Sequence, residues 1–573
     1  MNMNTSIKAS LIILGGLLSV QTMRTTNHLG HECQQCESTI YIPRPQNLNS
    51  AALFNPYYYP CCDENLNHGL SFSLGYRYEQ TWHNARIAEC LWGSDTLYFA
   101  GSQQTQRKPN KDYILAENFG LSPQFLGEIN FKPRIRNNII DCALRLELGD
   151  WVECLDKTYI AFNASLVHTA WNLNACEKTG NDQANPDNFI LPKCLHGTQQ
   201  EPALHTIFDA LSGNYSFGLL EKGPMPFGRF VLDQAQTKTD LANIDMIIGY
   251  DVYRCDGYHC GLFLKAVAPT GNRPNPETVF APIVGNAHHW ELGGGLDAHY
   301  DLWCCDDACL TVALTGAITH LFSDTQTRTF NIINDETCCL SQYSLLKEYY
   351  TETGADGKTT YKPANKLAWG TSFSTLDVHS SFAMQGDAAI QIMYRNCGWA
   401  FALGYNVYGR SSETISSIEE QEDRTNRIYG LKGKTGVCAQ NGTSLCVFET
   451  STNTTTRLQA TDSTNCVSDA TYGPAIVDPP VKDYTACTTW NGTTPVQDSK
   501  TPVILSQNKN INFTGTPTQI SHKLFAHIDY QWTECENQPF IGIGGECEFA
   551  QNGSCNVCTA SQWGTWLKGG LYF

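Results

Sequence analysis

The sequence has few charged residues, and basic residues are the scarcer kind. Only 16% of its 573 residues are charged, and 38 Lys and Arg stand against 56 Asp and Glu, which gives a formal net charge of −18. Nucleic-acid binding needs clustered basic side chains to meet phosphates, so a nucleic-acid partner is excluded. Outside the extreme N-terminus there is no run of 18 apolar residues, which excludes a protein built of transmembrane helices.

What the sequence has in quantity is cysteine and apolar side chains. The 42% hydrophobic content, with 11% aromatic residues, excludes an intrinsically disordered chain. Twenty-five cysteines in one chain favour an oxidising compartment over the cytosol. Residues 9–20 (ASLIILGGLLSV) form an apolar stretch too short to span a bilayer and of the length found in signal peptides. We therefore expect an exported protein whose signal peptide covers residues 1–22.

Apolar residues recur at every second position in about a dozen segments. In residues 70–82 the alternation places Leu70, Phe72 and Leu74 on one face and Ser71 and Ser73 on the other. Side chains of a strand alternate between its faces, so each segment is predicted to be a strand with one apolar and one polar side. The predicted strands are 70–82, 138–148, 158–171, 242–254, 260–268, 288–303, 309–322, 378–395, 399–410, 520–533, 540–549 and 563–573.

Charge is confined to the polar faces of these strands. We count twelve acidic and seven basic residues there, and only Arg254, at a strand end, on an apolar face. A charge facing lipid at mid-membrane costs about 2–4 kcal/mol, so this distribution suits strands that cross a membrane. A β-sandwich also keeps charge off one face, and the charges alone do not decide between the two architectures.

The connections between the strands decide it. Short links, such as 255–259 and 304–308, alternate with longer ones, such as 172–241 and 411–519. Short turns on one side and long loops on the other are typical of an up-and-down transmembrane barrel, whereas a Greek-key sandwich has no reason to show them. We therefore predict an all-β, antiparallel, up-and-down transmembrane β-barrel of about 12 strands, and at most 16.

The C-terminal sequence WGTWLKGGLYF carries a resemblance to a known class. It ends in the aromatic Phe573, with Leu571 and Leu567 alternating behind it. In this the chain resembles Gram-negative outer-membrane β-barrel proteins of the porin type, and its many cysteines are similar to those of the major outer-membrane proteins of chlamydia-like bacteria. The resemblance implies a location in the cell outer membrane, with outer-membrane lipid around the barrel. It also implies that Leu567, Leu571 and Phe573 form a signal for the barrel-assembly machinery.

The domain organisation follows from these assignments. Residues 23–68 are polar and contain proline, and they are either a periplasmic extension or a plug of the lumen. Residues 69–573 form the barrel with its long extracellular loops, of which 411–519 is the largest.

The cysteines gather at the short turns. Cys255 and Cys260 flank four residues, as do Cys304 and Cys309, so each pair is predicted to face across its hairpin as a disulfide. Cys397 and Cys535 are disulfide candidates with partners elsewhere, in the N-terminal segment, another turn or a neighbouring molecule. A homo-oligomer or disulfide-linked envelope partners are therefore expected alternatives.

No motif for catalysis or metal binding stands out. The pairs Cys33-x-x-Cys36 and Cys555-x-x-Cys558 have zinc-like spacing, but the predicted topology places them on opposite sides of the membrane. A G-x-S-x-G nucleophile elbow is missing from the sequence. We expect no enzyme, no cofactor and no metal, with a barrel hydrolase as the least favoured alternative.

The function that these observations favour is a passive, water-filled pore for small polar solutes. An excess of five acidic residues on the polar faces predicts a preference for cations. The alternative is a structural or adhesive envelope protein that uses the barrel to anchor its loops. The residues predicted to line the pore are Arg77, Glu79, Asp141, Arg145, Glu147, Asp245, Asp251, Asp297, Asp301, Asp387, Arg395, Lys523, Asp529 and Lys568; Lys265, Glu291, Arg410, Glu546 and Glu548 complete the twelve acids and seven bases.

Overall fold

All described residues belong to one compact unit, Gln35–Phe573. The computed structural model describes residues 38–53, 69–101, 106, 113–122, 124–150, 152–155, 157–179, 203–217, 220–255, 257–305, 308–334, 336–337, 340–357, 359–417, 427–432, 439–441, 444–447, 504–535, 537–551 and 558–572. The predicted signal peptide and most of the 411–519 loop lie outside these residues. Among the described residues, no helix has the length and apolar character needed to cross a membrane.

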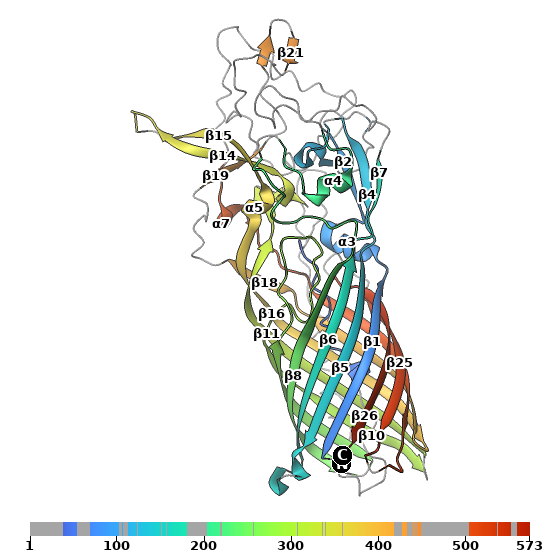
Figure 1. Cartoon of the computed structure of the whole chain (residues 1–573). Helices are drawn as coiled ribbons and strands as arrows, with labels where there is room; N and C mark the ends of the chain where they lie inside the picture. Colours follow the sequence, from blue (N-terminus) through green and yellow to red (C-terminus); the bar gives the residue numbers. More distant parts are fainter. Residues whose placement is uncertain are drawn as a thin grey trace. The chain divides into compact units, whose positions relative to one another are not determined.

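Twelve antiparallel strands form a closed barrel, as predicted (Figure 1). The strands are β1 (Leu70–Trp82), β5 (Arg134–Glu147), β6 (Thr158–Asn172), β8 (Gln236–Cys255), β9 (Tyr258–Pro269), β10 (Glu291–Cys305), β11 (Ala308–Thr329), β16 (Thr375–Asn396), β17 (Trp399–Arg410), β24 (Gln519–Gln531), β25 (Phe540–Ala550) and β26 (Ser561–Tyr572). Each strand pairs with its neighbours in chain order, and β1 pairs with β26 from Ser71↔Tyr572 to Trp82↔Ser561, which closes the ring. This confirms the predicted fold class and strand number.

The outside of the barrel is apolar, as lipid contact requires. Large hydrophobic side chains stand exposed at alternate positions, among them Leu264 (69% exposed), Leu403 (67%) and Ile543 (61%). A water-soluble protein does not leave so broad an apolar band uncovered. Closed antiparallel barrels with an even strand number and such an exterior are the spanning structures of bacterial outer membranes. The protein is an outer-membrane β-barrel, and the predicted location is confirmed.

Two bulges change which face a side chain occupies near the short turns. The pairing of β8 with β9 shifts between Asp251 and Tyr253, and that of β10 with β11 shifts between Asp301 and Trp303. A bulge adds one residue to a strand and so reverses the inside–outside alternation beyond it. For this reason Arg254, assigned from its position to the apolar face, reaches the inward-facing Asp251 at 3.7 Å.

The long loops fold into a cap whose hydrophobic core extends into the mouth of the barrel. One sheet contains β2 (Thr96–Ala100), β3 (Tyr113–Leu115), β4 (Leu126–Asn130) and β7 (Cys176–Thr179), and another contains β14 (Leu345–Thr353), β15 (Thr359–Trp369), β19 (Ile428–Leu431) and β22 (Ile504–Leu505). The shorter elements are α2 (Ser50–Leu53), α4 (Ile207–Ser212), α5 (Gly370–Ser374), α7 (Gln507–Asn510), β12 (Asn331–Asn334), β13 (Glu336–Thr337), β18 (Glu413–Ser417), β20 (Ala439–Asn441), β21 (Ser444–Val447) and β23 (Ile511–Asn512).

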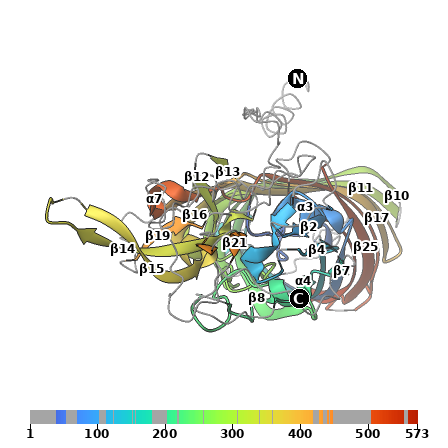
Figure 2. The same ribbon diagram turned by 90° about the horizontal axis from the view of Figure 1, so that it is seen from above.

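The cap is joined to the mouth of the barrel. Helix α3 (Ala85–Trp92) buries Ile87, Leu91 and Trp92 in a core that also contains Trp171 of β6 and Phe382 of β16. A disulfide between Cys90 and Cys558 ties the same helix to the segment before β26. Figure 2, looking down on the barrel, shows α3, β2 and β4 within the outline of the strand ring.

Candidate functional site

The candidate functional site is the barrel interior, where the predicted pore-lining residues lie. Eleven of these fourteen residues are buried from solvent: Arg77, Glu79, Asp141, Asp245, Asp251, Asp297, Asp387, Arg395, Lys523, Asp529 and Lys568. The other three, Arg145, Glu147 and Asp301, are partly exposed as whole residues and lie towards the short-turn ends of their strands, although the side chain of Asp301 itself is only 6% exposed. The expected open, water-filled lumen is therefore wrong for this structure, because other groups fill the space.

The first of these groups is residues 38–53, which we call the plug. Its central contact is made by Arg44, whose Nη2 donates to Asp387 Oδ1 at 2.7 Å and whose Nη1 donates to Glu548 Oε1 at 2.9 Å. Nη2 also donates to Asn406 Oδ1 at 3.0 Å, and the guanidinium lies over the ring of Tyr408. The Arg44 side chain is only 6% exposed, so the plug places a full positive charge inside the barrel between two carboxylates.

Further polar contacts join the plug to β1, β8 and β25. The Asn47 amide donates to Asp245 at 2.9 Å, and the Asn49 amide donates to Glu546 at 3.1 Å. The wall also donates to the plug, since Arg77 Nη2 meets the Gln46 carbonyl at 2.6 Å. Every one of these pairs joins the plug to a residue on the inner face of a strand.

Apolar contact holds the plug at both of its ends. Tyr41 and Ile42 are buried in the core that the cap shares with the barrel mouth, and the ring centroid of Tyr41 lies 6.1 Å from that of Trp171. Ala51 and Ala52 of α2 pack against Ala389, Phe525 and Trp566. Small cavities of about 20 and 40 Å³ adjoin the plug, the first beside Ala52 and the second beside Tyr41. Each has room for a few water molecules at most, so the plug fits the lumen closely.

Beside the larger cavity the cap contributes a buried phenol. Tyr343 donates to the Gly228 carbonyl at 2.6 Å, and burial raises its pKa above the usual value. It therefore stays a neutral hydrogen-bond donor where the cap meets the plug.

Large side chains that face inward narrow the lumen further. Tyr159, Phe525 and Trp566 each lie across a glycine of the neighbouring strand: Gly249, Gly404 and Gly544, respectively. A Cβ atom on these glycines would stand 2.1 to 2.4 Å from the ring, so no other residue fits there without displacing it. Sequence reasoning missed this arrangement because it assigned inward positions by polarity alone, although the paired glycines were a visible signal.

Lateral ion pairs neutralise much of the wall. Lys265 Nζ lies 2.8 Å from Asp245, and Lys523 Nζ lies 2.8 Å from Glu546. Arg77 contacts both Glu79, at 2.5 Å, and Asp141, at 3.1 Å. Burying a charge is tolerated when it is paired and hydrogen-bonded, and these pairs meet that condition.

The predicted assembly signal is partly described. Leu567 is 49% exposed on the lipid side of β26, and Leu571, opposite Phe72 of β1, is partly exposed. Phe573 lies outside the described residues. Whether these residues recruit the assembly machinery remains a prediction.

The two predicted hairpin disulfides have different outcomes. Cys304 stands opposite Cys309 and the two form a disulfide. The predicted Cys255–Cys260 pairing is wrong, because Cys255 stands opposite Tyr258 and Cys260 opposite Tyr253.

Other cysteines also depart from expectation. Cys397 and Cys535 are exposed at their turns. The Cys90–Cys558 disulfide was not anticipated, because Cys558 was weighed with Cys555 as a zinc-like pair.

Comparison with known proteins gives distant likenesses only. No family model and no curated protein matches the sequence. Among solved structures, an outer membrane channel from Pseudomonas putida F1 aligns over 91% of this chain and 100% of its own, with 9% identity and a TM-score of 0.31. The toluene transporter TbuX of Ralstonia pickettii aligns over 89% and 90%, with 11% identity and a TM-score of 0.25. The translocator domain of the autotransporter NalP from Neisseria meningitidis aligns over 89% and 90%, with 7% identity and a TM-score of 0.24. At this distance their names describe those proteins and not this one.

Proposed function

We propose that the protein is a gated outer-membrane channel for small polar solutes, closed here by the plug. The observation that carries the proposal is the chemistry of the plug interface. Arg44, Asn47 and Asn49 meet the wall through hydrogen bonds and ion pairs, and after them only Ala51 and Ala52 add apolar contact. Water can replace such contacts on both surfaces, so residues 44–52 can leave the wall without exposing a large apolar area, while Tyr41 and Ile42 stay packed in the apolar core.

The charge of the wall supports a preference for cations in the open state. The polar faces carry twelve acids and seven bases, the β8 bulge adds Arg254 as an eighth base, and Arg44 adds a ninth positive charge while the plug is seated. When Arg44 leaves, Asp387 and Glu548 lose this partner and the lumen keeps an excess of four negative charges. A narrow passage with such an excess attracts cations and repels anions. Transport in this proposal is passive, with no catalytic step and no cofactor.

Single-channel recording in planar bilayers tests the proposal. The triple variant Arg44→Ala/Asn47→Ala/Asn49→Ala removes polar contacts of the plug and leaves the strands unchanged. Losing even one charge-assisted hydrogen bond weakens the closed state by about 1.5–3 kcal/mol, and each 1.4 kcal/mol is tenfold in an equilibrium. We expect wild-type protein to be mostly closed and the triple variant to open at least about tenfold more often, with a cation-selective reversal potential.

The matched control is Arg273→Ala. Arg273 also makes a two-pronged contact with a carboxylate, Asp324, at 2.8 and 2.9 Å, but it belongs to a loop outside the plug. This variant should open no more often than wild type. An anion-selective reversal potential in the triple variant would contradict the cation preference and leave the gating intact.

A second candidate function is an anchor for the cap. A hydrophobic core holds α3 and α4 of the cap on the mouth of the barrel, as an externally presented domain would require. Labelling of Ser50→Cys by a water-soluble maleimide separates the two functions. If the triple variant exposes position 50 to the reagent and still never conducts, the channel proposal fails and the anchor is favoured.

A further inference from the structure

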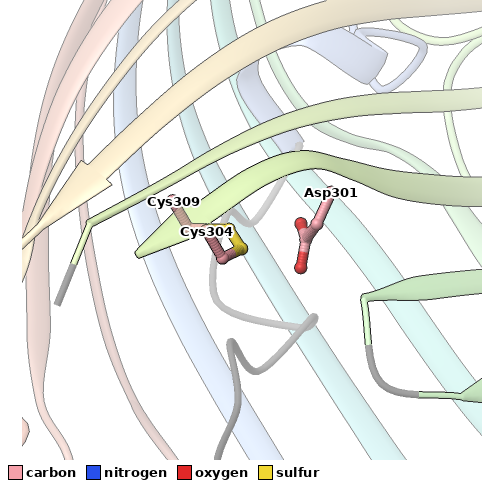
Figure 3. Close-up of side chains that lie close together, drawn as sticks. All are labelled: Asp301, Cys304 and Cys309. Atoms are coloured by element: carbon pink, nitrogen blue, oxygen red, sulfur yellow. A yellow bond between two sulfur atoms is a disulfide. The ribbon is translucent and has the colours of Figure 1, made fainter. Parts of the chain in front are cut away.

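The hairpin between β10 and β11 brings three metal-ligand side chains together at the short-turn end of the barrel. Cys304 and Cys309 form a disulfide with an S–S distance of 2.02 Å, and Asp301 lies beside it (Figure 3). One carboxylate oxygen of Asp301 and the two sulfur atoms all lie within 4.8 Å of one another. The two cysteines come from different strands, and Asp301 precedes Cys304 by three residues on β10.

The β10 bulge makes this arrangement possible. In a regular strand, residues three apart point to opposite faces, so Asp301 and Cys304 would be separated by the sheet. The register shift between Asp301 and Trp303 reverses the alternation, and Cys304 then stands opposite Cys309 on the face that Asp301 also occupies. Bulges are enriched beside functional sites because they re-aim side chains in this way.

One carboxylate oxygen of Asp301 accepts no hydrogen bond. Oδ1 accepts from Thr311 Oγ1 at 2.5 Å and lies 3.7 Å from Arg395 Nη2. Oδ2 is buried and has no hydrogen-bond partner, and the side chain as a whole is only 6% exposed. A buried acceptor without a partner costs about 1–3 kcal/mol, so its retention calls for a function.

We propose that reduction of the Cys304–Cys309 disulfide unmasks a binding site for a borderline-soft divalent cation, with Zn²⁺ as the best fit. Two thiolates and one carboxylate are ligands that Zn²⁺ accepts, and a water molecule completes a tetrahedron. In the oxidised state the sulfur electrons needed for the metal are held in the S–S bond. The site is therefore closed to metal when oxidised and open when reduced.

The chemistry balances with a dithiol reductant. Thiol–disulfide exchange transfers two electrons and two protons from the dithiol, which becomes a disulfide, to Cys304 and Cys309, which become thiols. Zn²⁺ then binds both sulfurs and Asp301 Oδ2, and the two thiol protons are released to water. The metal replaces the covalent link, so the hairpin stays cross-linked under reducing conditions.

Residue-specific alkylation tests the proposal on the full-length protein in detergent. The protein is reduced, freed of reductant, mixed with or without Zn²⁺, and treated briefly with iodoacetamide before mass spectrometry of the turn peptides. We expect Zn²⁺ to slow the alkylation of Cys304 and Cys309 together, and EDTA to restore it. Cys535, a cysteine at another short turn, is the internal control and should react equally fast with and without metal.

The Asp301→Asn variant tests the carboxylate. Outer-sphere partners of metal ligands already contribute about 10- to 100-fold to metal affinity, so loss of a direct ligand should weaken protection by at least about tenfold. Equal alkylation of Cys304 and Cys309 with and without Zn²⁺ in wild-type protein would overturn the proposal. Undiminished protection in Asp301→Asn would also overturn it, because the ligand set would then be a different one.

Discussion

The two faces of the barrel wall are built from the same strands and obey different rules. Leu264 is 69% exposed on the outer face of β9, whereas its neighbour Lys265 is buried on the inner face and lies 2.8 Å from Asp245. A side chain on the outer face needs only to be apolar, because lipid has no fixed structure that the side chain must match. A charged side chain on the inner face needs a partner at hydrogen-bond distance, because no bulk water is present to solvate an unpaired charge. Substitutions on the two faces should therefore fail for different reasons.

The largest effect is expected from Arg77→Ala on the inner face. Arg77 is 1% exposed, forms ion pairs with Glu79 and Asp141, and donates a hydrogen bond to the Gln46 carbonyl of the plug. Removing one member of a buried ion pair costs about 3–5 kcal/mol because the remaining charges lose their partner. Urea unfolding followed by tryptophan fluorescence should show this loss. In Arg273→Ala, an ion pair at a loop, the loss should stay below about 1 kcal/mol.

A smaller loss is expected from Leu264→Arg on the outer face. A charge facing lipid near mid-membrane costs about 2–4 kcal/mol. The same unfolding assay measures it in phospholipid bilayers. If the outer face were in water, a surface substitution of this kind would change the free energy of unfolding by only about 0.5 kcal/mol. A result that small would contradict the membrane assignment of β9.

The two cysteine hairpins offer a matched pair at still lower energy. Cys304→Ser/Cys309→Ser opens a loop of six residues, for which the chain-entropy relation gives about 2 kcal/mol. Cys255→Ser/Cys260→Ser should cost less than about 0.5 kcal/mol, because it breaks no disulfide. Unfolding of both variants under oxidising conditions makes the comparison. Equal losses would mean that the structure assigns the cross-strand pairing wrongly.

The smallest effect on stability, and a large one on yield, is expected from deleting Phe573. Phe573 is a single residue beyond the described end of β26, so its loss should change the free energy of unfolding by under about 1 kcal/mol. If the C-terminal residues are read by the assembly machinery, the amount of protein in the outer membrane should fall severalfold. Immunoblots of fractionated membranes measure this amount. Normal levels of the deletion variant would show that the terminal aromatic plays no part in assembly.

The outer face and the strand count could be predicted from sequence, whereas the inner contacts could not. Period-two alternation of apolar residues places all twelve strands, because lipid selects on residue type and every strand carries the same signal. Arg44 carries no such signal. The contribution of Arg44 to holding the plug depends on Asp387 and Glu548, which lie 343 and 504 residues further along the chain. The sequence around Arg44 gives no sign of that pairing.

The cysteine hairpins show that one local signal was overlooked. Both have four residues between their cysteines, but the centre of the turn differs. Asp256-Gly257, a typical hairpin turn dipeptide, directly follows Cys255, and Gly257 has a φ of +77°. Cys255 therefore pairs with Tyr258, and Cys260 lies two positions too far. In the other hairpin Cys304 and Cys309 are equally distant from the turn, so they meet.

The position of the plug in the chain has a consequence for biogenesis. The plug precedes β1 in the chain, yet β16 and β25, which hold Arg44, follow hundreds of residues later. Contacts between such distant residues form late, because a long stretch of chain must be ordered before they are gained. The seam between β1 and β26 joins the first barrel strand after the plug to the last barrel strand in the chain. Closing the ring and seating the plug thus both wait for the same late strands, and a barrel that closed without the plug would leave Asp387 and Glu548 on its inner face without the charge of Arg44.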